Sequence, residues 1–135
     1  MNAKTLVCRW GPALLWMAVI FLSSATPSRE LPRFGSLDVV VKKGGHMLGY
    51  AILALAYRRG LGWKMNRFPA AWALAMLYAL LDEFHQSFVP GRHPSLVDAL
   101  LFDAGGAAMA LWLGWALSRI RRSSAIDHTT GTTRN

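Results

Sequence analysis

The distribution of apolar and charged positions divides the chain into four apolar segments separated by short polar stretches. The clearest segment lies between Arg9 and Arg29, where residues 10–28 carry no charge, and about 20 such residues are enough to span a bilayer. The second and third segments reach spanning length only when their polar ends are included, and the fourth, residues 99–118, is long enough but is interrupted once, by Asp103. The pattern predicts an all-α, four-helix integral membrane bundle with short loops and with spans at about 10–28, 37–57, 68–88 and 99–118.

Residues 1–122 are therefore expected to form one four-span membrane domain. Residues 123–135 are polar and rich in threonine, which predicts a disordered cytoplasmic tail. A competing interpretation takes residues 1–25 as a cleaved signal peptide, because Ser23-Ser24-Ala25 is a small-x-small sequence after a charged start. Cleavage there would leave the other three spans in the same orientation.

The charge of the chain is strongly basic, with 15 Lys and Arg against 7 Asp and Glu. Ten of the basic residues fall in the N-terminal segment, the second connection and the C-terminal segment, with Asp127 as the single acid among them. The other connections hold five basic and six acidic residues. Basic residues favour the cytoplasmic side, so both termini are predicted to be cytoplasmic. The basic excess is thus a topology signal, and no nucleic-acid partner is expected.

This topology places nearly all the unusual polar residues at the outer ends of the helices. Lys43, His46 and Tyr50 open the second span at spacings of three and four, so they share one helix face. Ionisable residues within spans are rare, and they usually face the bundle interior or a wet cavity. The predicted ligand-binding residues are Lys43, His46, Tyr50, Asp82, Glu83, His85, Gln86, Arg92 and Asp98.

Several of these residues also have a purely structural interpretation. Ser95 followed by Asp98 is typical of a capping box at a helix start. In the structural interpretation, Arg92 does no more than pair with the carboxylates across the adjacent turn. His46 is then a hydrogen-bonded packing residue. Packing alone does not call for Glu83 and His85, since ionisable groups at membrane depth cost several kcal/mol unless paired.

Two kinds of chemistry fit this cluster. Glu83 and His85 are the candidate catalytic residues, because a carboxylate and an imidazole in a partly dry pocket suit general acid–base catalysis. Alternatively, Arg92 and Lys43 bind an anionic head group and Glu83 accepts hydrogen bonds from its donors.

The same end of the helices holds residue types that form two-His-plus-carboxylate metal sites. They are His46, Glu83, His85, His93, Asp98 and Asp103. Their spacing is not that of HExxH, and the chain has no nucleophile elbow, phosphate loop or CxxC. The single Cys8 excludes an intramolecular disulfide framework and a cysteine-based zinc cluster. We therefore predict neither a metal nor a cofactor.

One string in this region is long and chemically unusual: Asp82-Glu83-x-His85-Gln86-x-Phe88-x-Pro90-Gly91-Arg92. With Phe21, Ser23-Ser24, Lys43-x-x-His46, Tyr50, Ser95, Asp98 and Gly105-Gly106, it resembles the VanZ-like family, small membrane proteins named for teicoplanin resistance. The resemblance covers about residues 10–117. The chain departs from it at Lys42, where members often have Asp, and at Asp103, which lies one place past a common Asn.

The resemblance implies a bacterial multi-pass protein of the inner (cytoplasmic) membrane without an established catalytic activity. Besides membrane lipids, the expected partner of the outer-facing pocket is an envelope lipid or cell-wall component, either a cell-wall precursor or an anionic lipid head group. Binding there would affect susceptibility to the glycopeptide teicoplanin. Two other functions stay open: a membrane-embedded hydrolase or transferase acting on a lipid-linked substrate, and a structural or interaction module without a ligand.

Overall fold

The computed structural model describes residues 2–131, with their side chains except those of residue 65 and residues 121–131. The helices are α1 (Ala3–Ser24), α2 (Asp38–Leu61), α3 (Phe68–Gln86), α4 (Leu96–Asp98) and α5 (Ala104–Gly131). The shorter turns are η1 (Ser28–Glu30), η2 (Gly35–Leu37), η3 (Met65–Arg67) and the π-helical turn η4 (Ala99–Asp103). Because α4, η4 and α5 follow one another directly, the described chain is all-α with four long helices, as the sequence predicts.

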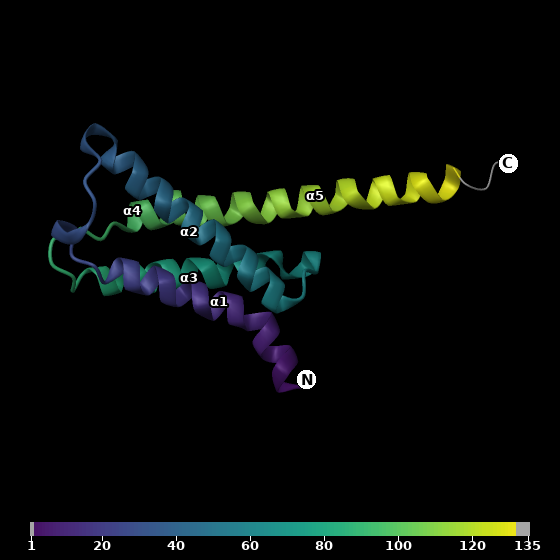
Figure 1. Ribbon diagram of the computed structural model, residues 1–135, viewed down its shortest axis with the longest axis horizontal. Helices are drawn as coiled ribbons and strands as arrows, with labels where there is room; N and C mark the ends of the chain where they lie inside the picture. The colour runs from purple at the N-terminus through teal and green to yellow at the C-terminus, as the bar shows by residue number, and fades with distance from the viewer. Residues whose placement is uncertain (1, 132–135) are drawn as a thin grey trace.

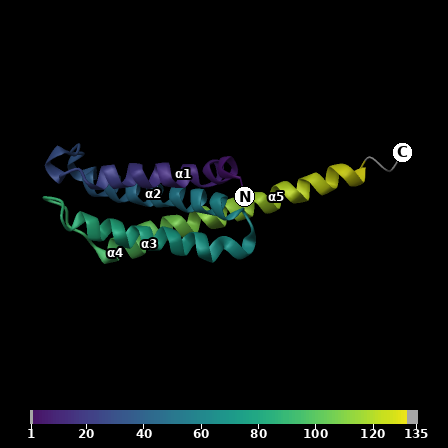
Figure 2. The same ribbon diagram turned by 90° about the horizontal axis from the view of Figure 1, so that it is seen from below.

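The helices are arranged in two layers, with α1 and α2 in one and α3 and α5 in the other (Figures 1 and 2). α2 is the central element, since it contacts α1, α3 and α5. Both termini lie toward the end of the bundle where α2 connects to α3 (Figure 1). The opposite end contains the connections 25–37 and 87–95, and we call it the distal end.

Three helical segments are long and apolar enough to cross a membrane: Ala3–Ser24, Gly35–Leu61 and Leu96–Ile120. They correspond to the first, second and fourth predicted spans. The third predicted span, 68–88, forms α3 but is not among these candidates, because its last turns carry acidic and other polar residues. The structure therefore supports a multi-pass membrane protein with three clear apolar spans.

The last helix is longer than the sequence predicts. It begins at Leu96 and continues to Gly131, through the first part of the segment 123–135 for which the composition predicts disorder. No Pro or Gly lies between Gly114 and Gly131, so no strong helix breaker ends the helix earlier. The disordered tail therefore stays a prediction: α5 extends to Gly131, and residues 132–135 lie outside the described part of the chain.

Many of the buried residues are alanines, whereas most of the large apolar residues lie on the outside of the bundle. In α3, Ala71, Ala75 and Ala79 are buried, as their spacing of four predicts. Large side chains face outward, among them Leu14, Leu15, Leu22, Leu77 and Leu113. A water-soluble bundle would bury such side chains, whereas lipid solvates them and leaves close backbone packing to hold the helices together.

Basic residues of α1 and α2 bind backbone carbonyls of each other's helix on the side of the termini. Pro12 has no N–H to donate to the Cys8 carbonyl, and Arg59 Nη2 donates to that oxygen at 3.3 Å. In return, Arg9 Nη2 donates to the Gly60 carbonyl at 2.7 Å. The basic residues that predict the topology thus also satisfy carbonyls that the helices leave unpaired.

Gly106 sets the distance between α2 and α5. A Cβ at this position would overlap the Met47 carbonyl oxygen, whereas one at the neighbouring Gly105 would meet open space. We expect Gly106→Ala to lower the free energy of unfolding by about 1–3 kcal/mol, because the two backbones must separate. Gly105→Ala is the matched control, and thermal unfolding of the detergent-solubilised chain measures both. Equal stability of the two variants would contradict this account of the contact.

Candidate functional site

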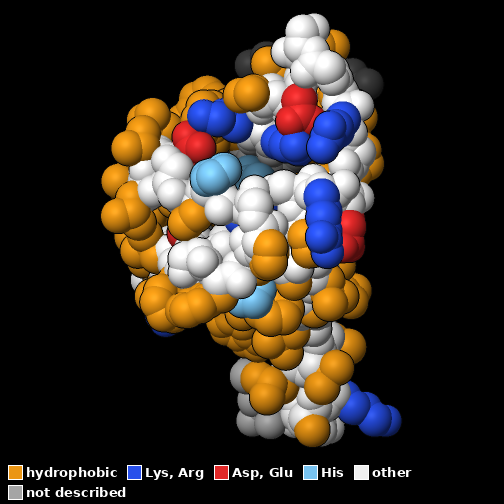
Figure 3. Space-filling view, turned by 90° about the vertical axis from the view of Figure 1, so that its left-hand side faces the viewer, with side chains coloured by type: hydrophobic (Ala, Val, Ile, Leu, Met, Phe, Trp, Pro, Cys, Tyr) orange, Lys and Arg blue, Asp and Glu red, His pale blue; other side chains and the backbone are white. Residues whose placement is uncertain are grey.

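The polar residues of the spans gather at the distal end of the bundle. Figure 3 looks onto this end, where Lys, Arg, Asp, Glu and His side chains surround a hollow and hydrophobic side chains cover the flanks. The hollow is formed by the end of α1, the start of α2, the end of α3 and the start of α4. The structure therefore brings the predicted polar helix ends to one place.

A closed hydrogen-bonded triad joins α1 to α3 beneath this hollow. Ser24 Oγ donates to Asp82 Oδ2 at 2.8 Å, and Gln86 Nε2 donates to the same oxygen at 2.9 Å. Gln86 Nε2 also lies 3.3 Å from Ser24 Oγ, and all three residues are buried. Because Asp82 and Gln86 are one helical turn apart, α3 presents both to the serine that ends α1.

Glu83 points to the start of the last helix instead. Its Oε2 accepts a hydrogen bond from the Ser95 backbone N–H, while Ser95 Oγ accepts from the Asp98 backbone N–H at 3.2 Å. The predicted N-cap is therefore confirmed, but Glu83 of α3 takes the place that Asp98 has in a capping box. The Asp98 carboxylate is free to bind Lys43 Nζ at 2.9 Å, which joins α2 to α4.

His46 and Asp103 face each other between α2 and η4. His46 Nδ1 lies 3.6 Å from Asp103 Oδ1, too far for a good hydrogen bond. Asp103 is only 3% exposed, and its Oδ1 has no hydrogen-bond partner among the described residues. Asp103 ends the π-helical turn, and π-bulges within α-helices are frequent at functional sites.

Arg92 binds the end of α1 and not the neighbouring carboxylates. Its Nη2 donates to the Ser23 carbonyl at 2.7 Å and its Nε to the Thr26 carbonyl at 3.1 Å. Partial burial lowers the pKa of Arg92, against the nearby Asp82 and Glu83 carboxylates that raise it, and a guanidinium stays charged at neutral pH.

The expected pairing of Arg92 with Asp82, Glu83 or Asp98 is therefore wrong for the described residues. The physical reason is that the last carbonyls of a helix have no partner within the helix, and the guanidinium satisfies two carbonyls where α1 ends.

The structure separates the two candidate catalytic residues. The His85 ring stacks on Phe21 of α1, with ring centres 4.4 Å apart, whereas Glu83 points to Ser95. Glu83 and His85 are separated because residues two positions apart on a helix point in nearly opposite directions. A joint acid–base role for Glu83 and His85 therefore has no geometric support.

The cluster also lacks a metal-binding arrangement in the part of the chain that the structure describes. No group of three His, Cys, Asp or Glu side chains there could hold a metal ion. The residue types that the sequence offers for a two-His-plus-carboxylate site are divided among separate contacts.

Several cavities open at the distal end, and predicted ligand-binding residues line two of them. The polar cavity, of about 270 Å³, lies between α2, α3 and η4. It is lined by Ser28, Asp38, Val39, Lys42, Lys43, His46, Glu83, Gln86, Gly91, Arg92, His93, Asp98, Phe102 and Asp103. Of the predicted ligand-binding residues, Lys43, His46, Glu83, Gln86, Arg92 and Asp98 therefore line one cavity.

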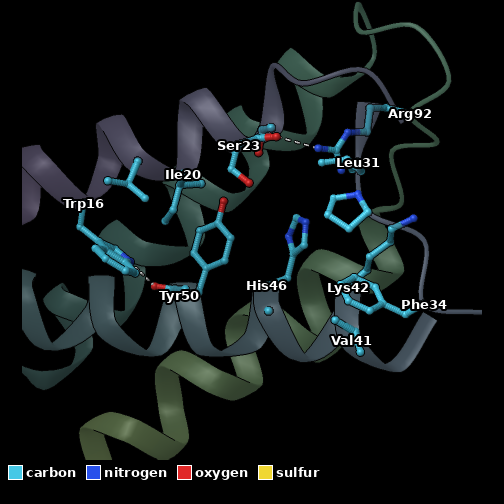
Figure 4. A pocket seen from close by; sticks show the side chains of 15 residues that line it. Trp16, Ile20, Ser23, Leu31, Phe34, Val41, Lys42, His46, Tyr50 and Arg92 are labelled. Atoms are coloured by element: carbon cyan, nitrogen blue, oxygen red, sulfur yellow. Dashed lines mark hydrogen bonds between the residues drawn. The ribbon is translucent and has the colours of Figure 1, made fainter. Parts of the chain in front are cut away.

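The apolar cavity, of about 390 Å³, lies between α1, α2 and the connection 25–37 (Figure 4). Its walls include Trp16, Ile20, Leu31, Phe34 and Val41, as Figure 4 shows. Tyr50 also lines it, and this buried residue's hydroxyl has no hydrogen-bond partner among the described residues. Three residues line both cavities: Lys42, His46 and Arg92.

Sequence reasoning missed the apolar cavity and part of the polar one. Leu31 and Phe34 lie in a connection without periodicity, so no pattern could assign them to the site. Asp38 and Lys42 form an ion pair of 2.6 Å at a spacing of four, a signal that the sequence does contain. Two of the predicted ligand-binding residues line neither cavity: His85 and Asp82, the second of which is enclosed by the triad.

Ser24 and Ser23 form a matched pair for testing the triad. Ser24→Ala leaves the buried Asp82 carboxylate without one donor, so the free energy of unfolding should fall by about 1–3 kcal/mol. Ser23→Ala keeps the carbonyl that Arg92 uses and should change stability little. Thermal unfolding in detergent compares them, and an equally small effect at both positions would show that the triad contributes little.

Comparison with known proteins gives one family. The family model described as VanZ/LLP1 matches residues 10–118, which include all of α2 and α3, parts of α1 and α5, and the residues that line the two cavities. No curated protein and no solved structure gives a significant match. With a match over most of its length, the chain belongs to the VanZ/LLP1 family.

Proposed function

We propose that this protein spans the bacterial cytoplasmic membrane four times and recognises an envelope lipid or cell-wall component through the polar cavity at its distal end. One observation carries the proposal: Glu83 and Asp103, both buried, line a cavity at the end of an otherwise apolar bundle. Charged groups at such depth are costly unless they are paired or functional. An outward-facing distal end would present them to lipid head groups and cell-wall precursors.

The charge distribution supports this orientation. The end of the bundle with the termini carries Arg58, Arg59, Lys64 and Arg67 in and beside the α2–α3 connection. Together with the terminal segments this side holds ten of the fifteen basic residues, and the positive-inside rule places it in the cytoplasm. The distal end would then face outward.

We also propose that α3, which is not among the three candidate spans, crosses the membrane. Its 19 residues extend over roughly 28 Å at 1.5 Å per residue, close to the thickness of the hydrocarbon core. Its acidic residues Asp82 and Glu83 are buried and bonded within the bundle, so they do not contact lipid. This arrangement supports a spanning helix whose last turn contributes to the site.

A structural module is the second candidate, because the Ser24–Asp82–Gln86 triad closes on itself and needs no ligand. The two candidates differ at His85, which stacks on Phe21 outside both cavities. If the cluster only holds the bundle together, His85→Ala should lower the folded yield in membranes. A loss of phenotype at normal yield in cavity variants favours binding instead.

The proposed orientation predicts which side of the membrane each connection faces. In a Cys8→Ser background, Ser36→Cys should react with a membrane-impermeant maleimide in intact cells, because residue 36 is exposed at the distal end. Asn66→Cys, exposed on the other side, should react only after the membrane is permeabilised. Labelling of residue 66 but not residue 36 in intact cells would reverse the topology and sink the proposal.

Loss of the buried acids should abolish the cellular effect without unfolding the chain. We expect expression of the protein to raise resistance to teicoplanin or to change envelope lipid composition in a sensitive host, and Glu83→Gln and Asp103→Asn to return both to the level of the empty vector. Both substitutions keep the side-chain shape, so membrane yield should be normal. Glu30→Gln, exposed and outside both cavities, is the control. Wild-type behaviour of both cavity variants would refute recognition by this cavity.

A further inference from the structure

The two cavities at the distal end differ in the sign of the groups they offer. The apolar cavity carries cationic groups, Lys42 and Arg92, and no Asp or Glu among its lining residues. The polar cavity adds four carboxylates, two of which are already paired with lysines: Asp38 with Lys42 and Asp98 with Lys43. The acids left without a lysine partner among the described residues are Glu83 and Asp103.

The apolar cavity has the shape and lining to hold part of a hydrocarbon chain. It extends along α1 from Trp16 to Ser23, about 10 Å at 1.5 Å per residue. Val19, Ile20 and Val41 also line it, and the connection 25–37 adds Leu31 (Figure 4). In the proposed orientation, the deep end of this groove lies at membrane depth and its charged end lies near the outer head groups.

Hydrogen-bond donors for an anion lie at the charged end of the apolar cavity, which we also call the apolar groove. Arg92 uses its Nε and Nη2 on carbonyls of the α1 end, which leaves other N–H groups of the guanidinium. Lys42 is held by an ion pair to Asp38 at a spacing of four, and such partly exposed pairs are weak enough to exchange for a ligand.

Hydrogen-bond acceptors for a cation lie in the adjoining polar cavity. Asp103 is 3% exposed, and its Oδ1 has no hydrogen-bond partner in the described part of the chain. A buried carboxylate oxygen without a donor costs free energy that a ligand ammonium could recover. Since Lys42, His46 and Arg92 line both cavities, one molecule can reach from the apolar groove to Asp103.

We propose, building on the function above, that the ligand is an aminophospholipid: an acyl chain in the apolar groove, its phosphate at Arg92 and Lys42, and its primary ammonium at Asp103 and Glu83. The order of apolar, cationic and anionic groups along the two cavities matches the order of chain, phosphate and ammonium in such a lipid. A head group with negative charge only would place that charge beside Glu83 and Asp103, neither of which is paired with a lysine among the described residues, and this is unfavourable.

The experiment uses the purified full-length protein in detergent and measures retained lipid by native mass spectrometry. Phosphatidylethanolamine and phosphatidylglycerol with identical acyl chains are offered at equal concentration, and free phosphoethanolamine is tested as a competitor. We expect phosphatidylethanolamine to be retained about ten-fold or more over phosphatidylglycerol, because a charge-assisted hydrogen bond is worth at least that factor. Free phosphoethanolamine should not compete, since it has no chain for the groove.

Two variants with controls test the separate contacts. Gly45 lines the groove and a Cβ there meets open space, so Gly45→Phe should fill the groove and reduce retention of both lipids at least ten-fold. Gly44→Phe, on the adjacent residue outside both cavities, is the matched control and should behave as wild type. Asp103→Asn should bring the ratio of the two lipids close to one.

The outcomes separate the lipid inference from the proposed function. If phosphoethanolamine competes as well as the lipid and Gly45→Phe retains lipid normally, the groove holds no chain and the inference is wrong. Equal retention of both lipids by the wild-type chain is equally decisive against it. In either case the proposed function still stands if Glu83→Gln and Asp103→Asn abolish the cellular effect. If no probe binds and these variants behave as wild type in cells, both proposals fail.

Discussion

A carboxylate at membrane depth must find its hydrogen-bond donors within the protein, and this requirement organises the distal end of the bundle. Asp82 receives bonds from Ser24 and Gln86, so the end of α1 and the end of α3 are joined through one oxygen. Glu83 accepts from the Ser95 backbone, so the same turn of α3 also holds the start of the last helix. The acids therefore determine where three helices meet.

The general architecture could be predicted from the sequence because it depends on composition and period. Four apolar segments give four long helices, and alanines at a spacing of four are buried. The partners of long polar side chains could not be predicted in the same way. Arg92 has several carboxylates within a few residues along the chain, yet it binds carbonyls of α1 that are distant in sequence. Such a partner follows from the angle between helices, which no local pattern encodes.

The candidate site could be predicted from the sequence only where it depends on helical periodicity. Helical periodicity places Lys43, His46 and Tyr50 on one face, and all three line a cavity. Glu83 and His85 are close in the sequence, but they lie on nearly opposite sides of α3 and contact different helices. The apolar cavity depends on Phe34 and its neighbours in an irregular connection, and its existence only follows from how that connection folds over α1 and α2.

The polar groups of the distal end fall into two classes that imply different roles. Ser24, Asp82 and Gln86 are joined through Asp82 Oδ2, and a network of this kind rigidifies the helices around it, although Asp82 Oδ1 has no hydrogen-bond partner among the described residues. Asp103 and Tyr50 are just as buried, but each keeps a polar atom without a partner among the described residues. Native proteins seldom leave such atoms unsatisfied, because desolvation costs free energy that no contact returns. A hydrogen-bonded network beside buried polar atoms without partners is the arrangement expected of a preorganised binding site, in which the free-energy cost of desolvation is met in folding, before the ligand binds.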